Sequence, residues 1–148
     1  MISAPAGQTL RPAAGRGGEA MAEGDRTATS LLLVEDNEVE REGLGIILRR
    51  EGFAVTEAAT GGEALAALRA GRPGLILLDM LLPGSRLDGW SLLENVRDVP
   101  EWSSIPVLII TGLGIASREW AVSLGARDVV RKPIEADELL QKIRSYVP

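Results

Sequence analysis

Two hydrophobic patterns alternate along the chain after residue 30. One is a short, nearly continuous apolar run, typical of a strand buried on both faces of a parallel sheet. These runs lie at 31–34, 53–57, 75–79, 105–111 and 127–131. The other pattern is a longer segment with apolar residues at helical spacing. Such segments lie at about 37–51, 61–70, 116–124 and 135–147, with one more beginning after Asp88. This alternation predicts an α/β fold in which helices cover both faces of a parallel sheet.

Local signals mark several helix ends. Thr60 and Glu63 fit a capping box, in which each side chain accepts a hydrogen bond from a free backbone N–H group. Gly52 and Gly71 are natural stops for the helices that precede them. For the first helix we predict one buried face. It is made by Val39, Gly43, Ile46, Ile47 and Arg50 and widened by Leu44 and Leu48.

Residues 1–29 show neither pattern. They are rich in Ala, Gly, Pro and Arg, and their charges cancel. We therefore predict a disordered tail at 1–29 and a folded domain at 30–148. The tail lacks the apolar core of a signal peptide, and Met21 is an alternative start. A role as a tether or docking peptide has no motif to support it.

Composition excludes several classes of chemistry. The chain has no Cys and no His, which excludes disulfides, thiolate nucleophiles, Ser–His triads and metals bound by these side chains. The net charge of −5 argues against a nucleic-acid partner. Because no apolar run is long enough to span a bilayer, we expect no membrane association and a cytoplasmic protein. Chemistry must use carboxylates, hydroxyls, Lys and hard metals such as Mg²⁺.

Polar residues stand where the predicted strands end. They are Glu35 and Asp36, Asp79, Thr111 and Lys132. The carboxyl ends of parallel strands meet at one edge of the sheet, so these side chains should lie together. Three carboxylates repel one another unless a cation such as Mg²⁺ intervenes. Asp79 could then attack phosphorus and form an acyl phosphate, with Lys132 and the Thr111 hydroxyl stabilising the transferred group.

Each of these residues also has an ordinary structural interpretation. Asp79 alone would be a cap, and Glu35–Asp36 could be an acidic pair at a helix start. Lys132 alone would be a solvated surface residue, and Thr111 would close a strand or a turn. Their convergence on one edge favours the chemical interpretation.

Four short motifs carry a family resemblance. They are Val34-Glu35-Asp36-Asn37, then Leu78-Asp79 followed by Pro83 and Asp88-Gly89, then Ile110-Thr111-Gly112, and Lys132-Pro133. With these four motifs in this order, residues from about 31 to 147 resemble the receiver domain of two-component response regulators. The resemblance implies a flavodoxin-like, doubly wound sheet of five parallel strands in the order 2-1-3-4-5, with five helices.

The resemblance also implies a role for each acidic residue. Asp79 is similar to the phospho-acceptor of the family. Glu35 and Asp36 are similar to the acidic pair that holds Mg²⁺ together with Asp79. The backbone carbonyl of Leu81 would be a further metal ligand.

Four other residues match the switch and the charged part of the family's site. Thr111 is similar to the hydroxyl that moves toward the phosphoryl group, and Gly112 to the small residue that leaves room for it. Lys132 is similar to the family's lysine, and Lys132–Pro133 to its usual cis peptide bond.

The chain departs from the family pattern in three places. The loop from Pro83 to Asp88 is about two residues longer than usual, and Leu81 is apolar where many members are polar. The aromatic switch residue expected three positions before Lys132 is Val129, which has no ring to swing inward.

The predicted function is a stand-alone receiver that accepts a phosphoryl group on Asp79 from a histidine kinase or phosphotransfer protein. It would catalyse at most its own phosphorylation from phosphodonors and slow autodephosphorylation, as a monomer or weak dimer. A downstream protein would bind the face formed by 116–147. Charged residues mark this face, namely Arg118, Arg127, Asp128, Arg131 and Glu135. The alternative is that these residues form an ordinary solvated surface.

Three alternatives stay open at this point. One is an adaptor or phosphate sink that works without phosphorylation, which Val129 favours. Another is a receiver excised from a larger regulator or hybrid kinase. The third is a Mg²⁺-dependent phosphatase, which would lack a second acid two residues after Asp79, where Leu81 stands.

Overall fold

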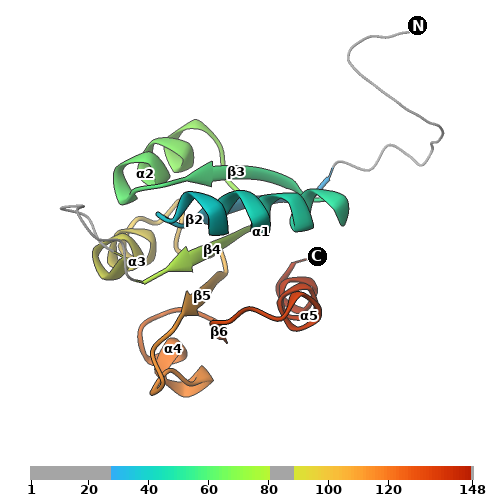
Figure 1. Cartoon of the computed structure of the whole chain (residues 1–148). Coiled ribbons are helices and arrows are strands. Elements are labelled where there is room, and N and C mark those ends of the chain that lie inside the picture. Colours follow the sequence, from blue (N-terminus) through green and yellow to red (C-terminus); the bar gives the residue numbers. More distant parts are fainter. Residues whose placement is uncertain (1–27, 81–88, 148) are drawn as a thin grey trace, which may run out of the picture.

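The computed structural model describes residues 28–80 and 89–147, in which five strands alternate with five helices (Figure 1). The strands are β2 (Ser30–Val34), β3 (Ala54–Ala58), β4 (Leu75–Asp79), β5 (Val107–Thr111) and β6 (Asp128–Arg131). The helices are α1 (Glu38–Arg50), α2 (Gly61–Ala70), α3 (Gly89–Asp98), α4 (Arg118–Ser123) and α5 (Ala136–Tyr146). The predicted boundaries differ from these by at most two residues.

All strands lie in one parallel sheet in the order β3-β2-β4-β5-β6. In chain order this is 2-1-3-4-5, so the predicted flavodoxin-like fold is confirmed. The register pairs Val34 with Leu78, Asp79 with Ile110, and Thr111 with Arg131. The ends of β2, β4, β5 and β6 therefore meet at one edge of the sheet.

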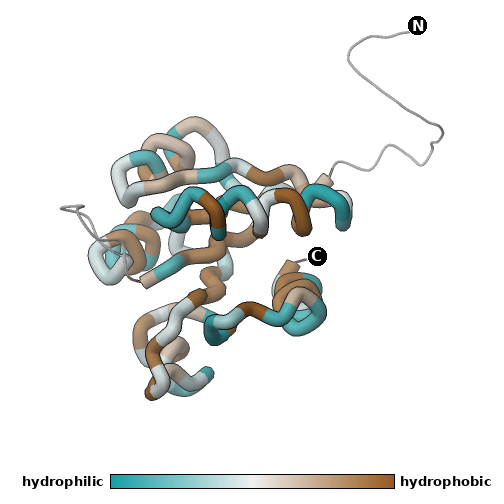
Figure 2. Tube along the Cα trace, in the orientation of Figure 1, coloured by the Kyte–Doolittle hydropathy of each residue, from teal (hydrophilic) through white to brown (hydrophobic). Residues whose placement is uncertain are grey.

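Two hydrophobic cores lie on the two faces of the sheet. Side chains of β2 alternate between them, with Leu31 and Leu33 on the face covered by α1 and α5, and Leu32 and Val34 on the face covered by α2, α3 and α4. Every residue of β4 is buried, as expected for the central strand of a sheet with two covered faces. Figure 2 shows hydrophobic residues concentrated along the central strands, whereas the helices are mixed.

The predicted capping box at the start of α2 is present, with one shift. The backbone N–H of Glu63 donates to Thr60 Oγ1 at 3.0 Å, as predicted. The carboxylate of Glu63 accepts at 2.8 Å from the N–H of Ala59, one residue before the cap. Helix α1 is capped in a similar way, since Glu40 N donates to Asn37 Oδ1 at 2.9 Å.

The predicted buried face of α1 is right for Leu44, Ile47 and Leu48, which pack against the sheet, and wrong for Val39, Gly43, Ile46 and Arg50, which are exposed. Val39 and Ile46 are 79% and 50% exposed, whereas Leu44 and Leu48 are buried. Seven residues make nearly two helical turns, so Val39 and Ile46 share one side of α1, and Leu48 lies opposite Val39. Both stripes have apolar residues at helical spacing, but only the one with Leu44 and Leu48 contacts the sheet.

Helix α1 is tied to the edge strand β3 by charged side chains. Glu57 forms ion pairs with Arg41 at 3.4 Å and Arg49 at 2.8 Å. Arg49 Nη2 also donates to the carbonyl of Val55 at 3.0 Å. The outer strand of the sheet is thus held by its own neighbouring helix.

Several sequence predictions lie outside the described residues. These are most of the predicted tail (1–27), the Leu81 carbonyl, and the loop from Pro83 to Asp88. Thr29, at the end of the predicted tail, is described, and its carbonyl accepts from Ala54 N at 2.9 Å. Within the described ranges, no helix is both long enough and apolar enough to cross a membrane.

Candidate functional site

Three carboxylates meet at the carboxyl edge of the sheet. Glu35 and Asp36 directly follow β2, and Asp79 is the last residue of the adjacent strand β4. One oxygen from each lies within 4.8 Å of the others. Glu35 and Asp79 are only 1% and 4% exposed, so their charges are held in a poorly solvated place. Buried carboxylates this close need a positive partner to remain ionised.

Glu35 is held in place but is not fully satisfied. Its Oε2 accepts from Asn37 N at 3.2 Å, and Arg41 Nη1 donates to its backbone carbonyl at 3.0 Å. Its Oε1 is buried without a hydrogen bond in the described part of the chain, although Lys132 Nζ lies 3.2 Å away. Burial, followed by the hydrogen bond and charge of Asp79, raises the pKa of Glu35 to about 7. A bound cation would offset the free-energy cost of keeping the buried Glu35 carboxylate ionised.

Lys132 follows β6 and brings a positive charge into the same pocket. Its Nζ lies 3.2 Å from Asp79 Oδ2 and 3.2 Å from Glu35 Oε1. The nearest carboxylate oxygen is Glu40 Oε1, at 2.9 Å. Burial lowers the pKa of Lys132, but these carboxylates outweigh it and hold the pKa above its usual range. The ammonium is therefore charged at every pH at which the protein would work. The Lys132–Pro133 peptide bond is cis, as the family resemblance implied.

Glu40 is the residue that the sequence did not indicate. It belongs to no motif, and it lies in the first turn of α1, five residues after Glu35. The only available signal was that α1 begins at the same edge of the sheet where the strand-end residues gather.

Thr111 lies at this edge, but its hydroxyl is engaged elsewhere. It is the fully buried last residue of β5, and its Oγ1 accepts from Leu113 N at 3.1 Å. A Thr111 hydroxyl that moved toward Asp79 would have to leave Leu113. A Cβ placed on Gly112 would meet no atom within 4 Å, so the space beside Thr111 is open.

Val129 occupies the position where the family resemblance places an aromatic ring. It is buried in β6, in the core that also holds Ala116 and Ala121. Beside it lies a hollow of about 430 Å³ lined by residues of α4, β6 and α5. Next to this hollow, Arg131 Nε donates to the carbonyl of Ala116 at 2.8 Å and links the end of β6 to the segment before α4.

The acidic residues fit a divalent cation. The three acidic residues offer carboxylate oxygens, which suit Mg²⁺, and Glu35 Oε1 is a buried acceptor with no hydrogen bond among the described residues. Glu35, Asp36 and Asp79 would hold the ion. The predicted fourth ligand, the carbonyl of Leu81, lies outside the described residues.

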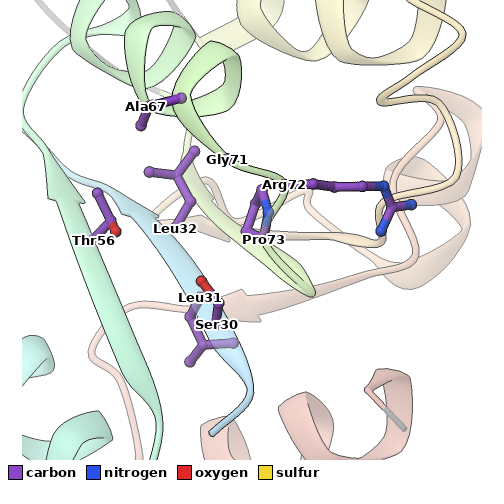
Figure 3. A pocket seen from close by; sticks show the side chains of 9 residues that line it. Ser30, Leu31, Leu32, Thr56, Ala67, Gly71, Arg72 and Pro73 are labelled. Atoms are coloured by element: carbon purple, nitrogen blue, oxygen red, sulfur yellow. The ribbon is translucent and has the colours of Figure 1, made fainter. Parts of the chain in front are cut away.

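A second hollow, of about 290 Å³, lies at the opposite, amino edge of the sheet (Figure 3). It is lined mainly by apolar side chains, including Leu32 and Pro73. The one charged residue among its lining residues, Arg72, donates to Ser104 Oγ at 2.7 Å. This hollow brings together no set of reactive groups comparable to the acidic site.

Comparison with known proteins identifies the architecture. Residues 31–144 match the family model described as the response regulator receiver domain. The chain is 39% identical over 120 residues to the transcriptional regulatory protein CseB of Streptomyces avermitilis, covering 80% of this chain and 49% of CseB. It is 32% identical over 118 residues to Protein PilH of Pseudomonas aeruginosa, covering 79% of this chain and 96% of PilH.

A solved structure agrees with these sequence matches. The receiver domain of NtrX from Brucella abortus is 36% identical, with a TM-score of 0.70 over 78% of this chain and 96% of that one. The chain spans about half the length of the CseB proteins and of several other curated relatives, but nearly all of PilH.

Proposed function

This chain belongs to the response regulator receiver family, and we propose that it accepts a phosphoryl group on Asp79 with the help of Mg²⁺. The observation that carries the proposal is the position of Asp79 in the pocket. The Asp79 carboxylate lies between two further acids that fit a cation and the ammonium of Lys132, 3.2 Å away.

The chemistry follows from these side chains. A carboxylate oxygen of Asp79 attacks phosphorus, and the P–N bond of a partner's phosphohistidine breaks. The electron pair of that bond returns to the imidazole nitrogen, which takes up a proton, and an acyl phosphate forms on Asp79. Glu35 and Asp36 would hold Mg²⁺, which neutralises charge on the phosphoryl oxygens when bound. Lys132 supplies a second positive charge, and Thr111 a hydroxyl donor once it leaves Leu113.

The phosphoryl donor would be a histidine kinase or a phosphotransfer protein. Among the described residues, Val39 in the first turn of α1 and Ile115 in the segment after Thr111 are large apolar side chains near the acidic edge that are 79% and 78% exposed. Such exposed apolar residues beside a reactive pocket suit contact with a protein rather than with a small metabolite.

The response would pass to a downstream protein through the face formed by α4, β6 and α5. Thr111 and Arg131 are neighbours across β5 and β6, and Arg131 holds the carbonyl of Ala116. A shift of Thr111 would thereby reach the segment before α4. We further propose that the protein acts in the cytoplasm, as a monomer or weak dimer, without a nucleic-acid partner.

Two alternatives each have an observation in their favour. Val129, in place of a ring, favours a receiver-like adaptor that works without phosphorylation. The half-length coverage of CseB and of RegX3 proteins favours a receiver that is part of a larger regulator.

Phosphorylation can be tested with a small phosphodonor. The protein is incubated with Mg²⁺ and acetyl phosphate, and the intact mass is measured. We expect one added phosphoryl group that disappears in Asp79→Ala and persists in the control Asp98→Ala, which alters an exposed carboxylate on α3. No adduct, or an adduct that persists in Asp79→Ala, would contradict the proposal.

A further inference from the structure

Lys132 is shared among three carboxylates, and one of them differs from the other two. Glu35 and Asp79 lie at strand ends, with side chains only 1% and 6% exposed. Glu40 lies on α1 and its side chain is 47% exposed, yet its oxygen is the nearest to Lys132 Nζ, at 2.9 Å. We propose that Glu40 is a positioning residue that holds Lys132 in the resting site and restrains phosphorylation, because it must release the lysine when a phosphoryl group binds.

The first argument concerns the charges around the ammonium group. In this structure three carboxylates lie within 3.2 Å of Lys132 Nζ. The ammonium donates a hydrogen bond to Asp79 Oδ2, whereas Glu35 and Glu40 contact it as ion pairs. A phosphoryl oxygen that approaches Lys132 must therefore compete with these negative charges, and the competition is relieved if one of them moves away.

The second argument identifies which carboxylate can move. Asp79 receives the phosphoryl group, and Glu35 is a buried member of the acidic cluster. Glu40 is half exposed, so its carboxylate can turn toward water, and exposed ion pairs of this kind are weakly held. Glu40 is thus the ligand of Lys132 that can be exchanged for a phosphoryl oxygen.

The third argument is electrostatic and predicts two effects of opposite sign. Glu40 and Asp79 contact the same nitrogen, so their oxygens lie within about 6 Å of each other. Neutralising Glu40 should assist an incoming phosphoryl anion and disfavour a bound cation. At this distance, in a partly solvated site, we expect the phosphorylation rate to rise and the Mg²⁺ affinity to fall, each by about three- to tenfold.

The inference rests on the proposed function, and Glu40→Gln tests it. The matched control is Glu42→Gln, which removes the same charge from the same helix but about 200° around it, at an exposed residue. Phosphorylation by acetyl phosphate is followed by intact mass at saturating Mg²⁺, and Mg²⁺ affinity is measured separately by calorimetry.

We expect Glu40→Gln to be phosphorylated about three- to tenfold faster and to bind Mg²⁺ more weakly by a similar factor, with Glu42→Gln near wild type. A helix that is merely disturbed would lower both quantities. Joint loss of rate and affinity in Glu40→Gln, or equal behaviour of the two variants, overturns the inference.

A second background tests whether Glu40 acts through the lysine. In Lys132→Ala, Glu40→Gln should still weaken Mg²⁺ binding, because that effect comes directly from the lost charge, but its acceleration of phosphorylation should be smaller than in the wild-type background. If the acceleration is undiminished in Lys132→Ala, Glu40 does not act by positioning Lys132. If the wild-type chain takes up no phosphoryl group, the proposed function fails. If it does take one up and Glu40→Gln matches Glu42→Gln, only the role of Glu40 fails.

Discussion

The pKa of Glu35 should make the stability of the metal-free protein fall as the pH rises. Its ordinary pKa is 4.5, and burial together with Asp79 raises it to about 7 in the folded chain. Between these two values the folded state keeps a proton that the unfolded state has lost, so a rise in pH favours unfolding. Each pKa unit corresponds to about 1.4 kcal/mol, so the loss of stability is at most about 3.5 kcal/mol and is complete above pH 7.

Equilibrium urea unfolding in EDTA, followed by tryptophan fluorescence from pH 5 to pH 8, measures this loss. The matched variant is Glu35→Gln, which cannot ionise. The chain has no His, so no imidazole titrates in the same window. We expect a decline of the free energy of unfolding with pH in the wild-type protein that is steeper than in Glu35→Gln.

Magnesium should reverse this trend. Because the ion binds the ionised carboxylates, it should stabilise the wild-type protein more at pH 8 than at pH 5. Equal pH slopes for wild type and Glu35→Gln, or a larger effect of Mg²⁺ at pH 5, would refute the assignment of the buried charge to Glu35.

Further predictions concern packing and are checked by urea unfolding. Gly89→Ala would place a Cβ 2.5 Å from Met80 Cα, so we expect it to destabilise the fold by about 1–3 kcal/mol and to slow phosphorylation of the adjoining acceptor. Gly43→Ala, whose Cβ would meet no atom within 4 Å, should instead stabilise helix α1 by about 0.5–1 kcal/mol, and a loss there would contradict the packing argument. Tyr146→Phe removes the hydrogen bond from its hydroxyl to Asp128 Oδ2, 3.1 Å long, and should cost about 1 kcal/mol; no loss would mean that this contact does not hold α5 on β6.

The sequence predicted the sheet well because its signals are local and repeated. Each strand is a compact apolar run, and the run 75–79 agrees with β4 residue for residue. The carboxyl ends of parallel strands share an edge whatever the loops do. This is why Glu35, Asp36, Asp79 and Lys132 were expected together and lie together.

The features that the sequence missed depend on how helices are rotated and where long side chains reach. The spacing of Val39 and Ile46 is as helical as that of Leu44 and Leu48, so periodicity alone could not select the buried stripe. Glu40 was missed for a related reason. Its contact with Lys132 joins residues 92 positions apart and depends on the docking of α1, which leaves no trace in local spacing.

The attachment of Arg49 to β3 has a consequence for behaviour at high concentration. A strand at the border of a sheet presents unpaired backbone groups that can recruit a strand from another molecule. Here the guanidinium of Arg49 occupies the carbonyl of Val55, and Glu57 places a charge beside it. An approaching strand would have to displace both groups and desolvate them. This side of the molecule is therefore protected against edge-to-edge aggregation, so the protein can stay dispersed at high concentration.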